Sequence, residues 1–455
     1  MFAAFINSLK VKDLRNRIFY AAGIIILCRI ASTIPCPGVD PHALKLYVAE
    51  LSKSTGGSSG VFGMFDLFSG GALRKFAVAT LGIMPYISAS IIMTLLTPVL
   101  PALEKLQRQG DVGRQKINQY MRHLTVLICV IQGAMAATAM LKPQNLGLKA
   151  PPMQLVIVNH TYFLIMTVVI LTAGTMLLVW LGEMITKHGI GQGISLIITV
   201  NIMARLPQAV GTLYEMAKTG GGITHSSFRA VHVLLLLLIF VAVTAATILI
   251  TQGQRRVPIQ KATKAMGAKM RGGSTTYLPL KINHSGVMPI IFASAILSFL
   301  RMFIGWIPYT RRYAVYFTYG AGGYMMTYGM LIIVFSYFWV ANQFNPIQIA
   351  DNLKREGAYV PGIRPGQPTA SFLDFTMTRI TFAGSLFLTG LALFPMFLYK
   401  LLHIPPLVAA FFGGTSLLII VGVLLDTISQ LESHLVMHNY DGFLKKGRVR
   451  GRRMK

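Results

Sequence analysis

The chain alternates long apolar segments with shorter polar ones, and this alternation is its strongest structural signal. A helix that crosses about 30 Å of hydrocarbon needs roughly 20 mostly apolar residues. About ten segments meet that requirement, at 18–34, 77–100, 124–140, 162–181, 189–210, 230–250, 286–307, 313–341, 382–402 and 407–425. The pattern therefore predicts an all-α membrane protein with about ten transmembrane helices.

Positive charge marks alternate connections between these segments. Cytoplasmic loops of inserted proteins carry the excess of Lys and Arg. The strongly basic segments are the start (Lys10, Lys12, Arg15, Arg17), the loop with Lys105, Arg108, Arg114, Lys116 and Arg122, the loop 252–281 and the tail 445–455. Ten crossings place all of them on one side, so both termini are predicted to be cytoplasmic.

Composition agrees with lipid as the main solvent. Hydrophobic residues make up 54% of the chain and charged residues 12%, whereas roughly a quarter of a soluble domain is charged. The net charge of +28 is therefore interpreted mainly as a determinant of topology, with a second use in docking an anionic partner.

The sequence lacks the residues that several kinds of chemistry require. It has no GxxxxGK[ST] phosphate-binding motif, its three cysteines are scattered, and no histidine pair has the HExxH spacing. No catalytic residue, metal or cofactor is therefore predicted. The predicted spans are almost free of acidic residues, and Arg29 lies near enough to a helix end for its charge to reach the membrane surface by snorkelling.

Several loops are long enough to form structures of their own. The external loop 35–75 holds a Gly/Ser-rich stretch and then apolar residues between glycines. That pattern fits a compact movable segment or an ordinary surface loop. On the cytoplasmic side, the loop 252–284 has the signals of a β-hairpin, and the Pro/Gly-rich loop 343–371 is predicted to project as a fixed structure.

Isoleucines recur at helical spacing in two predicted spans. Ile83, Ile87 and Ile91 are spaced i, i+4 and i+8, and Ile194 with Ile198 repeats the step, so each set lies on one helix face. An apolar ring of such residues closes a pore by excluding water. Isoleucines that pack between helices or face lipid have the same spacing, so both interpretations stay open here.

Longer motifs resemble a known family. The segments 68–73 (FSGGAL) and 81–92 (LGIMPYISASII) are similar to the SecY family of protein-conducting channels. Further similar segments follow in family order: 180–183 (WLGE), 189–195 (GIGQGIS), 253–256 (GQRR), 278–283 (LPLKIN), 350–354 (ADNLK), 361–366 (PGIRPG) and 413–419 (GGTSLLI). The resemblance extends from the first predicted span to the tail.

This resemblance implies a channel of ten helices in two inverted, pseudo-symmetric halves, at 1–210 and 211–440, with a basic cytoplasmic tail at 441–455. In the family an apolar ring seals the pore. Matching by motif places in this ring Ile83, Ile87, Ile198, Ile291 and Ile419, with Ile194 close by. The family's plug corresponds to about 60–73, with Met64, Phe65, Leu67, Phe68, Ser69, Gly70 and Gly71.

The resemblance also implies a lateral gate, where a signal sequence binds and apolar segments leave for lipid. The residues expected to border it are Ser88, Ser90, Ile91, Thr94, Ser294 and Ser298. Arg255, Arg256 and Arg364 lie on the two cytoplasmic loops and are expected to dock the ribosome, by contact with its RNA, or the SecA ATPase.

The function implied is the central channel of the Sec translocon in the cell inner membrane. Such a channel passes unfolded secretory proteins and releases transmembrane segments into lipid, and it is no enzyme. The implied partners are SecE- and SecG-like small membrane subunits, SecA, the ribosome, signal sequences, unfolded polypeptide and membrane lipid.

Two features depart from the family pattern, and two rival functions remain. Pro258 interrupts a strand ladder unless it lies at an edge, so the cytoplasmic hairpin is expected to differ in shape. The insert 54–60 leaves the start of the plug undefined. A small-solute transporter predicts ionisable residues near the bilayer midplane, whereas a structural scaffold predicts no pore.

Overall fold

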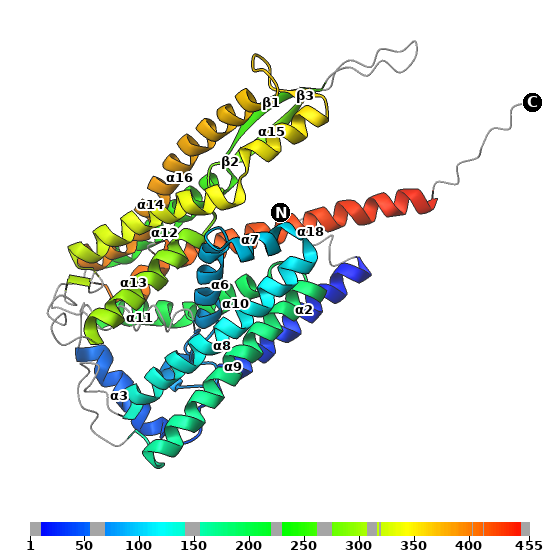
Figure 1. Ribbon diagram of the computed structural model, residues 1–455. Coiled ribbons are helices and arrows are strands. Elements are labelled where there is room, and N and C mark those ends of the chain that lie inside the picture. Colours follow the sequence, from blue (N-terminus) through cyan, green and yellow to red (C-terminus); the bar gives the residue numbers. More distant parts are fainter. Residues whose placement is uncertain are drawn as a thin grey trace, which may run out of the picture.

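Long helices dominate the computed structural model, which describes residues 11–54, 69–141, 155–219, 230–261, 275–306, 316–317, 320–402, 404–412 and 414–446 (Figure 1). The first part of the chain forms α2 (Lys12–Ala31), α3 (Pro41–Ser54), α5 (Ala72–Lys75), α6 (Met84–Leu96), α7 (Pro101–Arg108), α8 (Asp111–Leu141), α9 (His160–His188), α10 (Gly193–Met203) and α11 (Leu206–Thr219). The second part forms α12 (Ala230–Gln252), β1 (Gln254–Lys261), β2 (Thr275–Lys281), α13 (Met288–Trp306), α14 (Gly322–Gln343), α15 (Pro346–Arg355), β3 (Ala358–Tyr359), α16 (Gln367–Leu402), α17 (Pro406–Phe412) and α18 (Thr415–Lys446).

Most of the long helices could cross a membrane. Within the described ranges, seven helical spans are long and apolar enough, and eight if the bent pair α6 and α7 counts as one span. Each of the ten predicted spans overlaps at least one of the helices named above. The prediction of an all-α membrane protein is therefore confirmed, whereas the number ten stays a prediction.

The second predicted span is wrong in its bounds. The sequence predicts a helix over 77–100, but α6 begins only at Met84 and ends at Leu96. Gly82 has a φ of +58°, which glycine adopts easily and a regular helix does not. Pro85 lies in the first turn of α6, where its missing N–H is tolerated. Beyond Leu96 the chain bends by 96° into α7.

Several other spans differ in their bounds, and the predicted span 189–210 is divided between α10 and α11. Helix α8 begins 13 residues before the predicted 124–140 and α16 begins 15 residues before 382–402, because a helix continues into polar sequence that a hydropathy pattern does not include. The last predicted span, 407–425, is divided between α17 and α18. Gly414, between them, has a φ of +117°, so the helix is interrupted there.

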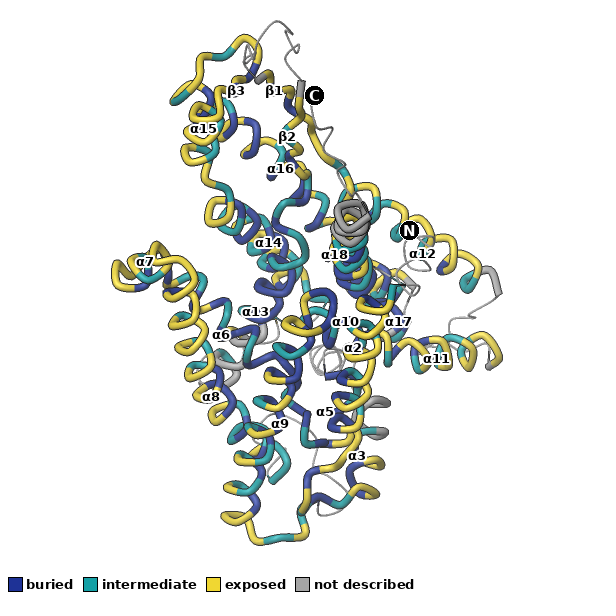
Figure 2. Tube along the Cα trace, turned by 90° about the vertical axis from the view of Figure 1, so that its right-hand side faces the viewer, coloured by how far each residue is buried: buried dark blue, intermediate teal, exposed yellow. Residues whose placement is uncertain are grey.

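One apolar core joins the two parts of the chain. Its buried members come from α2, α6, α9, α10 and α11 of the first part and from α13, α14, α16, α17 and α18 of the second. Figure 2 shows this buried trace in the middle of the molecule, with exposed residues on the outer helices. On α12, Leu234, Leu237 and Leu238 are each more than 60% exposed. Large exposed apolar faces are rare in soluble proteins, so these outer faces fit a lipid environment.

A three-stranded sheet projects from one end of the helices. β1 and β2 pair antiparallel from Gln254 opposite Lys281 to Gln260 opposite Thr275, so both strands of the predicted hairpin are present, whereas the residues between them lie outside the described residues. β3 pairs with the other side of β1, but only at Gln260 and Lys261. β3 does not extend to Pro258, so Pro258 lies at an edge of the sheet on the side of β1 that faces away from β2. Strand β1 therefore continues through the proline.

Packing against α16 fixes this sheet in place. We call the sheet, α15 and the first turns of α16 the projecting arm (Figure 1). Asn345 caps α15 by accepting a hydrogen bond from the Gln348 N–H at 3.2 Å, and the Thr369 hydroxyl donates to the Arg364 carbonyl at 2.9 Å. The apolar cluster beneath the sheet consists of Val257, Leu280, Val340, Val360, Leu373 and Met377.

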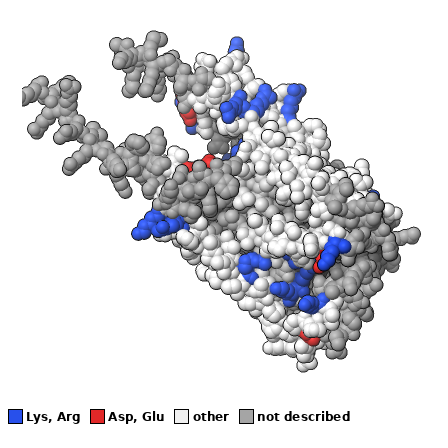
Figure 3. All heavy atoms as spheres, turned by 180° about the vertical axis from the view of Figure 1, so that it is seen from behind, with Lys and Arg blue, Asp and Glu red and all other residues white. Residues whose placement is uncertain are grey.

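The basic segments lie toward the same end of the molecule. In Figures 1 and 2 the start of α2, helix α7, the projecting arm and the end of α18 lie toward the upper end, whereas α3, the end of α8 and the start of α9 lie toward the lower end. Figure 3 shows Lys and Arg side chains on the projecting arm and a second group of them in the lower half of the molecule. If all of these basic segments are cytoplasmic, they must lie toward one end of the molecule, as they do here.

Close packing of α9 on the chain before α6 gives a test of the fold. A Cβ atom added to Gly174 would lie 2.2 Å from the carbonyl oxygen of Val78, whereas one added to Gly23 on α2 would meet nothing within 4 Å. We expect Gly174→Ala to destabilise the protein by about 1–3 kcal/mol through overpacking, and Gly23→Ala to be neutral. Thermal unfolding of the purified protein in detergent measures both, and equal melting temperatures would contradict the packing.

Candidate functional site

The six isoleucines of the predicted ring gather in the apolar core. Ile83 precedes α6, Ile87 lies on α6, Ile198 on α10, Ile291 on α13 and Ile419 on α18. These five are between 2% and 7% exposed and belong to one cluster of buried side chains. Ile194 is partly buried and packs against that cluster. Four helices, two from each part of the chain, thus contribute isoleucines to one buried apolar cluster.

Helical spacing explains why these side chains converge. Ile87 and Ile91 share one face of α6, as their i, i+4 spacing requires, and Ile83, the N-cap residue just before the helix, lies in the same buried cluster. Ile198 and Ile202 repeat the step on α10, and Ile202 is fully buried. A contact made only of such side chains opposes ion passage, because a narrow apolar constriction does not hold water.

The hydroxyl groups of the predicted lateral gate bond within their own helices. Helices α6 and α13 are in contact. Ser88 is buried on α6 and donates to the Met84 carbonyl at 3.0 Å, and Ser294 is buried on α13 and donates to the Ile291 carbonyl at 2.8 Å. A hydroxyl that is satisfied by its own helix keeps that bond when two helices separate.

The remaining gate residues are spread along the same two helices. Ile91 is buried, whereas Ser90 and Thr94 are half-buried. Thr94 donates to the Ser90 carbonyl at 2.7 Å, so this bond too is internal to α6. Ser298 lies on α13, but its side chain lies outside the described residues.

Only the end of the predicted plug is described. Met64, Phe65, Leu67 and Phe68 lie outside the described residues. Ser69 is buried, and its hydroxyl oxygen accepts a hydrogen bond from the Leu73 N–H at 3.3 Å. Gly70 and Gly71 follow with φ values of +64° and +94°. These are left-handed conformations that favour glycine, which accounts for the Gly-Gly pair in the motif.

The expectation that Arg29 snorkels to the surface is wrong. Its Nη1 and Nη2 atoms lie 3.3 and 3.4 Å from the carbonyl oxygen of Gly70, and Nη1 also donates to the Asn201 side-chain oxygen at 3.2 Å. The half-buried guanidinium therefore points into the protein. Sequence reasoning missed this contact because its partners are 41 and 172 residues away. The available signal was an arginine within an apolar segment.

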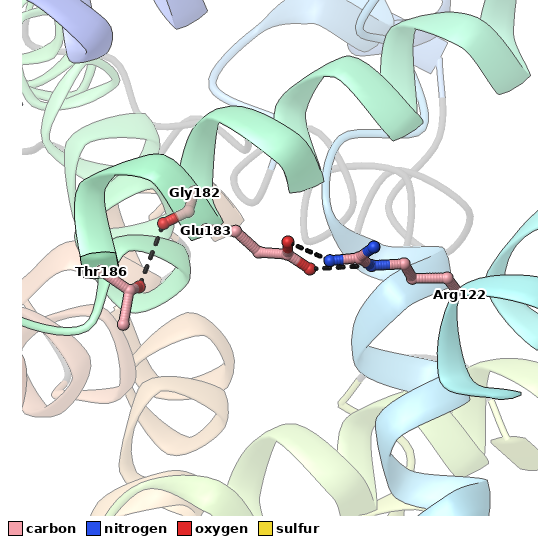
Figure 4. A network of polar contacts seen from close by, with 4 residues as sticks. All are labelled: Arg122, Gly182, Glu183 and Thr186. Carbon is pink, nitrogen blue, oxygen red and sulfur yellow. Dashed lines mark hydrogen bonds and ion pairs between the residues drawn. The ribbon is translucent and has the colours of Figure 1, made fainter. Parts of the chain in front are cut away.

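An ion pair joins α8 to α9 near the upper ends of these helices. Arg122 donates to both carboxylate oxygens of Glu183, with an Nε–Oε1 distance of 3.1 Å (Figure 4). One turn further on, the Thr186 hydroxyl donates to the Gly182 carbonyl at 3.0 Å and accepts from the Gly193 N–H at 2.9 Å. These bonds connect α8, α9 and the start of α10. Sequence reasoning placed Glu183 only at a helix end.

The predicted docking arginines are all exposed on the projecting arm. Arg255 and Arg256 are neighbours on β1, and Arg364 lies between β3 and α16. Successive side chains of a strand point to opposite faces of a sheet, so Arg255 and Arg256 do not form one fork for a single phosphate. The arm presents cations on both faces instead. Among the described residues, no group of three His, Cys, Asp or Glu side chains is placed to hold a metal ion.

Comparison with known proteins identifies relatives over nearly the whole chain. The SecY family model matches residues 77–428. Protein translocase subunit SecY of Chlamydia muridarum (strain MoPn / Nigg) is 40% identical over 97% of this chain and 98% of its own length. Protein translocase subunit SecY of Thermotoga maritima is 39% identical over the full length of both chains.

Solved structures share the fold at lower identity. A structure described as a protein conducting channel has a TM-score of 0.59 and 17% identity over 93% of each chain. Sec61 in the canine ribosome-channel complex from the endoplasmic reticulum has a TM-score of 0.56 and 16% identity over 92% of each chain. Both structures support the arrangement of helices described above.

The Arg122–Glu183 pair should stabilise the contact of α8 with α9. The two side chains are 46% and 22% exposed, so we expect a coupling of about 1 kcal/mol for this two-pronged pair. A double-mutant cycle with Arg122→Ala and Glu183→Ala, followed by unfolding in mixed micelles, measures it. The exposed Arg108–Glu104 pair on α7 serves as the control and should give no more than about 0.5 kcal/mol. Equal couplings would contradict a structural role for the α8–α9 pair.

Proposed function

The chain belongs to the SecY family, and we propose that it forms the protein-conducting channel of a protein translocase. Relatives named Protein translocase subunit SecY match it over nearly their whole length at 39–40% identity. The channel passes unfolded secretory proteins across a membrane and releases transmembrane segments into the lipid. It makes and breaks no covalent bond and is therefore not an enzyme.

The observation that carries this function is the burial of isoleucines from α6, α10, α13 and α18 in one apolar cluster. In the closed state, these side chains exclude water and ions from the passage. Apolar contacts are non-directional, so the ring can close around peptide side chains of many shapes and close again afterwards. We propose Ile83, Ile87, Ile194, Ile198, Ile291 and Ile419 as this ring, and about 60–73 as the plug beside it.

The contact of α6 with α13 supports a lateral gate at this seam. Ser88 and Ser294 keep their hydrogen bonds to Met84 and Ile291 when the helices separate. An apolar segment of the translocating chain gains roughly 25 cal/mol for each Å² of surface that it moves from water into lipid. This gain drives the segment sideways, and a bound signal sequence stabilises the open seam.

The partners that drive translocation are proposed to dock on the projecting arm. A passive channel needs a motor or a growing chain, because the sequence has no nucleotide-binding motif. Exposed arginines on both faces of the arm suit ribosomal RNA or the SecA ATPase. A related fold occurs in a ribosome-channel complex. We further propose SecE- and SecG-like subunits, a location in the cell inner membrane and cytoplasmic termini, in line with the basic end of the molecule.

Crosslinking of a stalled secretory chain tests the pore directly. Single cysteines replace Ile83, Ile198, Ile291 and Ile419 in a protein in which the buried Cys28, Cys36 and Cys129 are changed to alanine. A chain that threads the ring should crosslink at all four positions. Val169→Cys, on the outer face of α9 and 61% exposed, is the control and should not crosslink. Crosslinks at none of the four, with the chain engaged, would reject the pore.

A polar residue in the ring should loosen the seal. Ile419 is 3% exposed, whereas Leu424 on the same helix is 44% exposed. We expect Ile419→Asn to raise ion leakage through the resting channel and to allow export of proteins with weak signal sequences, because an amide side chain holds water in the constriction. Leu424→Asn should do neither. Ion flux into proteoliposomes and an export assay measure both effects, and identical behaviour of the two variants would exclude Ile419 from the ring.

A further inference from the structure

The carbonyl group of Gly70 lies in a polar pocket within an otherwise apolar region. Arg29 on α2 reaches it with both terminal nitrogens, at 3.3 and 3.4 Å. The same guanidinium donates to the side-chain oxygen of Asn201 on α10 at 3.2 Å. Asn201 is only 2% exposed. We call Arg29, Asn201 and the Gly70 carbonyl the hinge clamp.

A second guanidinium lies against the next residue. A Cβ atom added to Gly71 would meet Cζ of Arg205 at 3.0 Å, and one added to Gly70 would meet Nη1 of Arg29 at 2.4 Å. Arg205 is 8% exposed and donates to the side-chain oxygen of Gln208. The Gly-Gly pair thus passes between two guanidinium groups, which would have to shift if either glycine carried a side chain. The positive φ values of both residues favour glycine.

All parts of the hinge clamp belong to the first part of the chain. α2 and α10 contact each other, and both pack on α9. The proposed lateral gate lies elsewhere, where α6 meets α13. Separation of α6 from α13 therefore moves none of the three clamp groups relative to the others.

The chemistry of the clamp also favours its persistence. A guanidinium in a protein remains charged, and hydrogen bonds from a charged donor are the stronger ones. If the Gly70 carbonyl left, the arginine would retain its charge in an apolar region with fewer acceptors, which is unfavourable. The apolar contacts of the pore ring carry no such penalty when they part.

We propose that Arg29, held by Asn201, is a positioning residue that fixes the chain at Gly70 in both the closed and the open channel. This role rests on the proposed function, since it keeps Gly70 against α2 and α10 in every state of the channel. Ser69, Gly70 and Gly71 then remain beside these helices when a polypeptide enters. Arg29 acts through the backbone of the plug hinge and does not contact the translocating chain.

Protection of a cysteine at position 69 tests the clamp. Ser69 is 2% exposed, and Ser69→Cys is a conservative change. In a protein with no other cysteine, we expect slow labelling by a water-soluble maleimide both in the resting channel and in a channel that holds a stalled chain. A large increase in the labelling rate on engagement would show that the hinge leaves its pocket, and would overturn the clamp.

Substitutions of Arg29 test its contribution. Arg29→Ala should speed labelling of Ser69→Cys in the resting channel at least about tenfold, because loss of a charged hydrogen bond raises local opening by that order. Arg29→Lys keeps the positive charge but loses the two-pronged guanidinium, so it should give a smaller increase in the labelling rate. This variant replaces Arg29→Ala in the test if the alanine protein does not accumulate. Arg15→Ala, an exposed arginine on the same helix, should change nothing.

A second cysteine separates local from general loosening. Cys129 on α8 is fully buried, so its labelling in a protein that contains only this cysteine reports overall stability. Arg29→Ala should leave it slow, and equal acceleration at both positions would mean a general structural role. Engagement is established independently by the crosslink at Ile83→Cys. Absence of the Ile83→Cys crosslink would count against the proposed channel itself. If the crosslink forms but Arg29→Ala leaves the labelling rate of Ser69→Cys unchanged, the clamp alone is refuted.

Discussion

The buried apolar cluster that includes isoleucines of α6, α10, α13 and α18 is the interaction on which the rest of the structure depends. It is the place where the two parts of the chain meet around a common centre. A contact of this kind has no donor or acceptor that must find its partner again after separation. A polar group at the same place would need a hydrogen-bond partner in every state of the channel. An apolar seal is therefore suited to a passage that opens for chains of any sequence.

Directional polar contacts hold each part together instead. Arg29 ties α2 to α10 and to Gly70, Arg122 ties α8 to α9, and Thr186 ties α9 to α10. All of these bonds lie within the first part of the chain, and the bonds that order the projecting arm lie within the second. Hydrogen bonds depend steeply on geometry, so they make each part stiff. The seam between them, made of apolar side chains, is left to move.

Hydropathy was sufficient for the fold class and insufficient for the breaks in helices. Helix α9 covers His160–His188 where 162–181 was predicted, because its whole apolar segment is one regular helix. The spans at 77–100 and 407–425 were misjudged because Gly82 and Gly414 adopt positive φ values, which an average of apolar residues cannot register. Spacing predicted that Ile83, Ile87 and Ile91 share a face. The placement of Ile291 and Ile419 in the same buried cluster was expected only from family resemblance, since no local pattern encodes proximity between distant helices.

The buried arginines bear on the rival function of small-solute transport. Such a transporter is expected to place ionisable groups within the membrane and near its substrate. Arg29 and Arg205 are ionisable groups inside the protein, as the first of these two conditions requires. Their described partners, however, are groups of the chain itself: the Gly70 carbonyl, the Asn201 amide and the Gln208 amide. The buried cluster that joins the two parts of the chain consists of hydrophobic residues, both aliphatic and aromatic. Charge inside this protein thus serves to fix a hinge, while the proposed passage is lined by residues that recognise no particular solute.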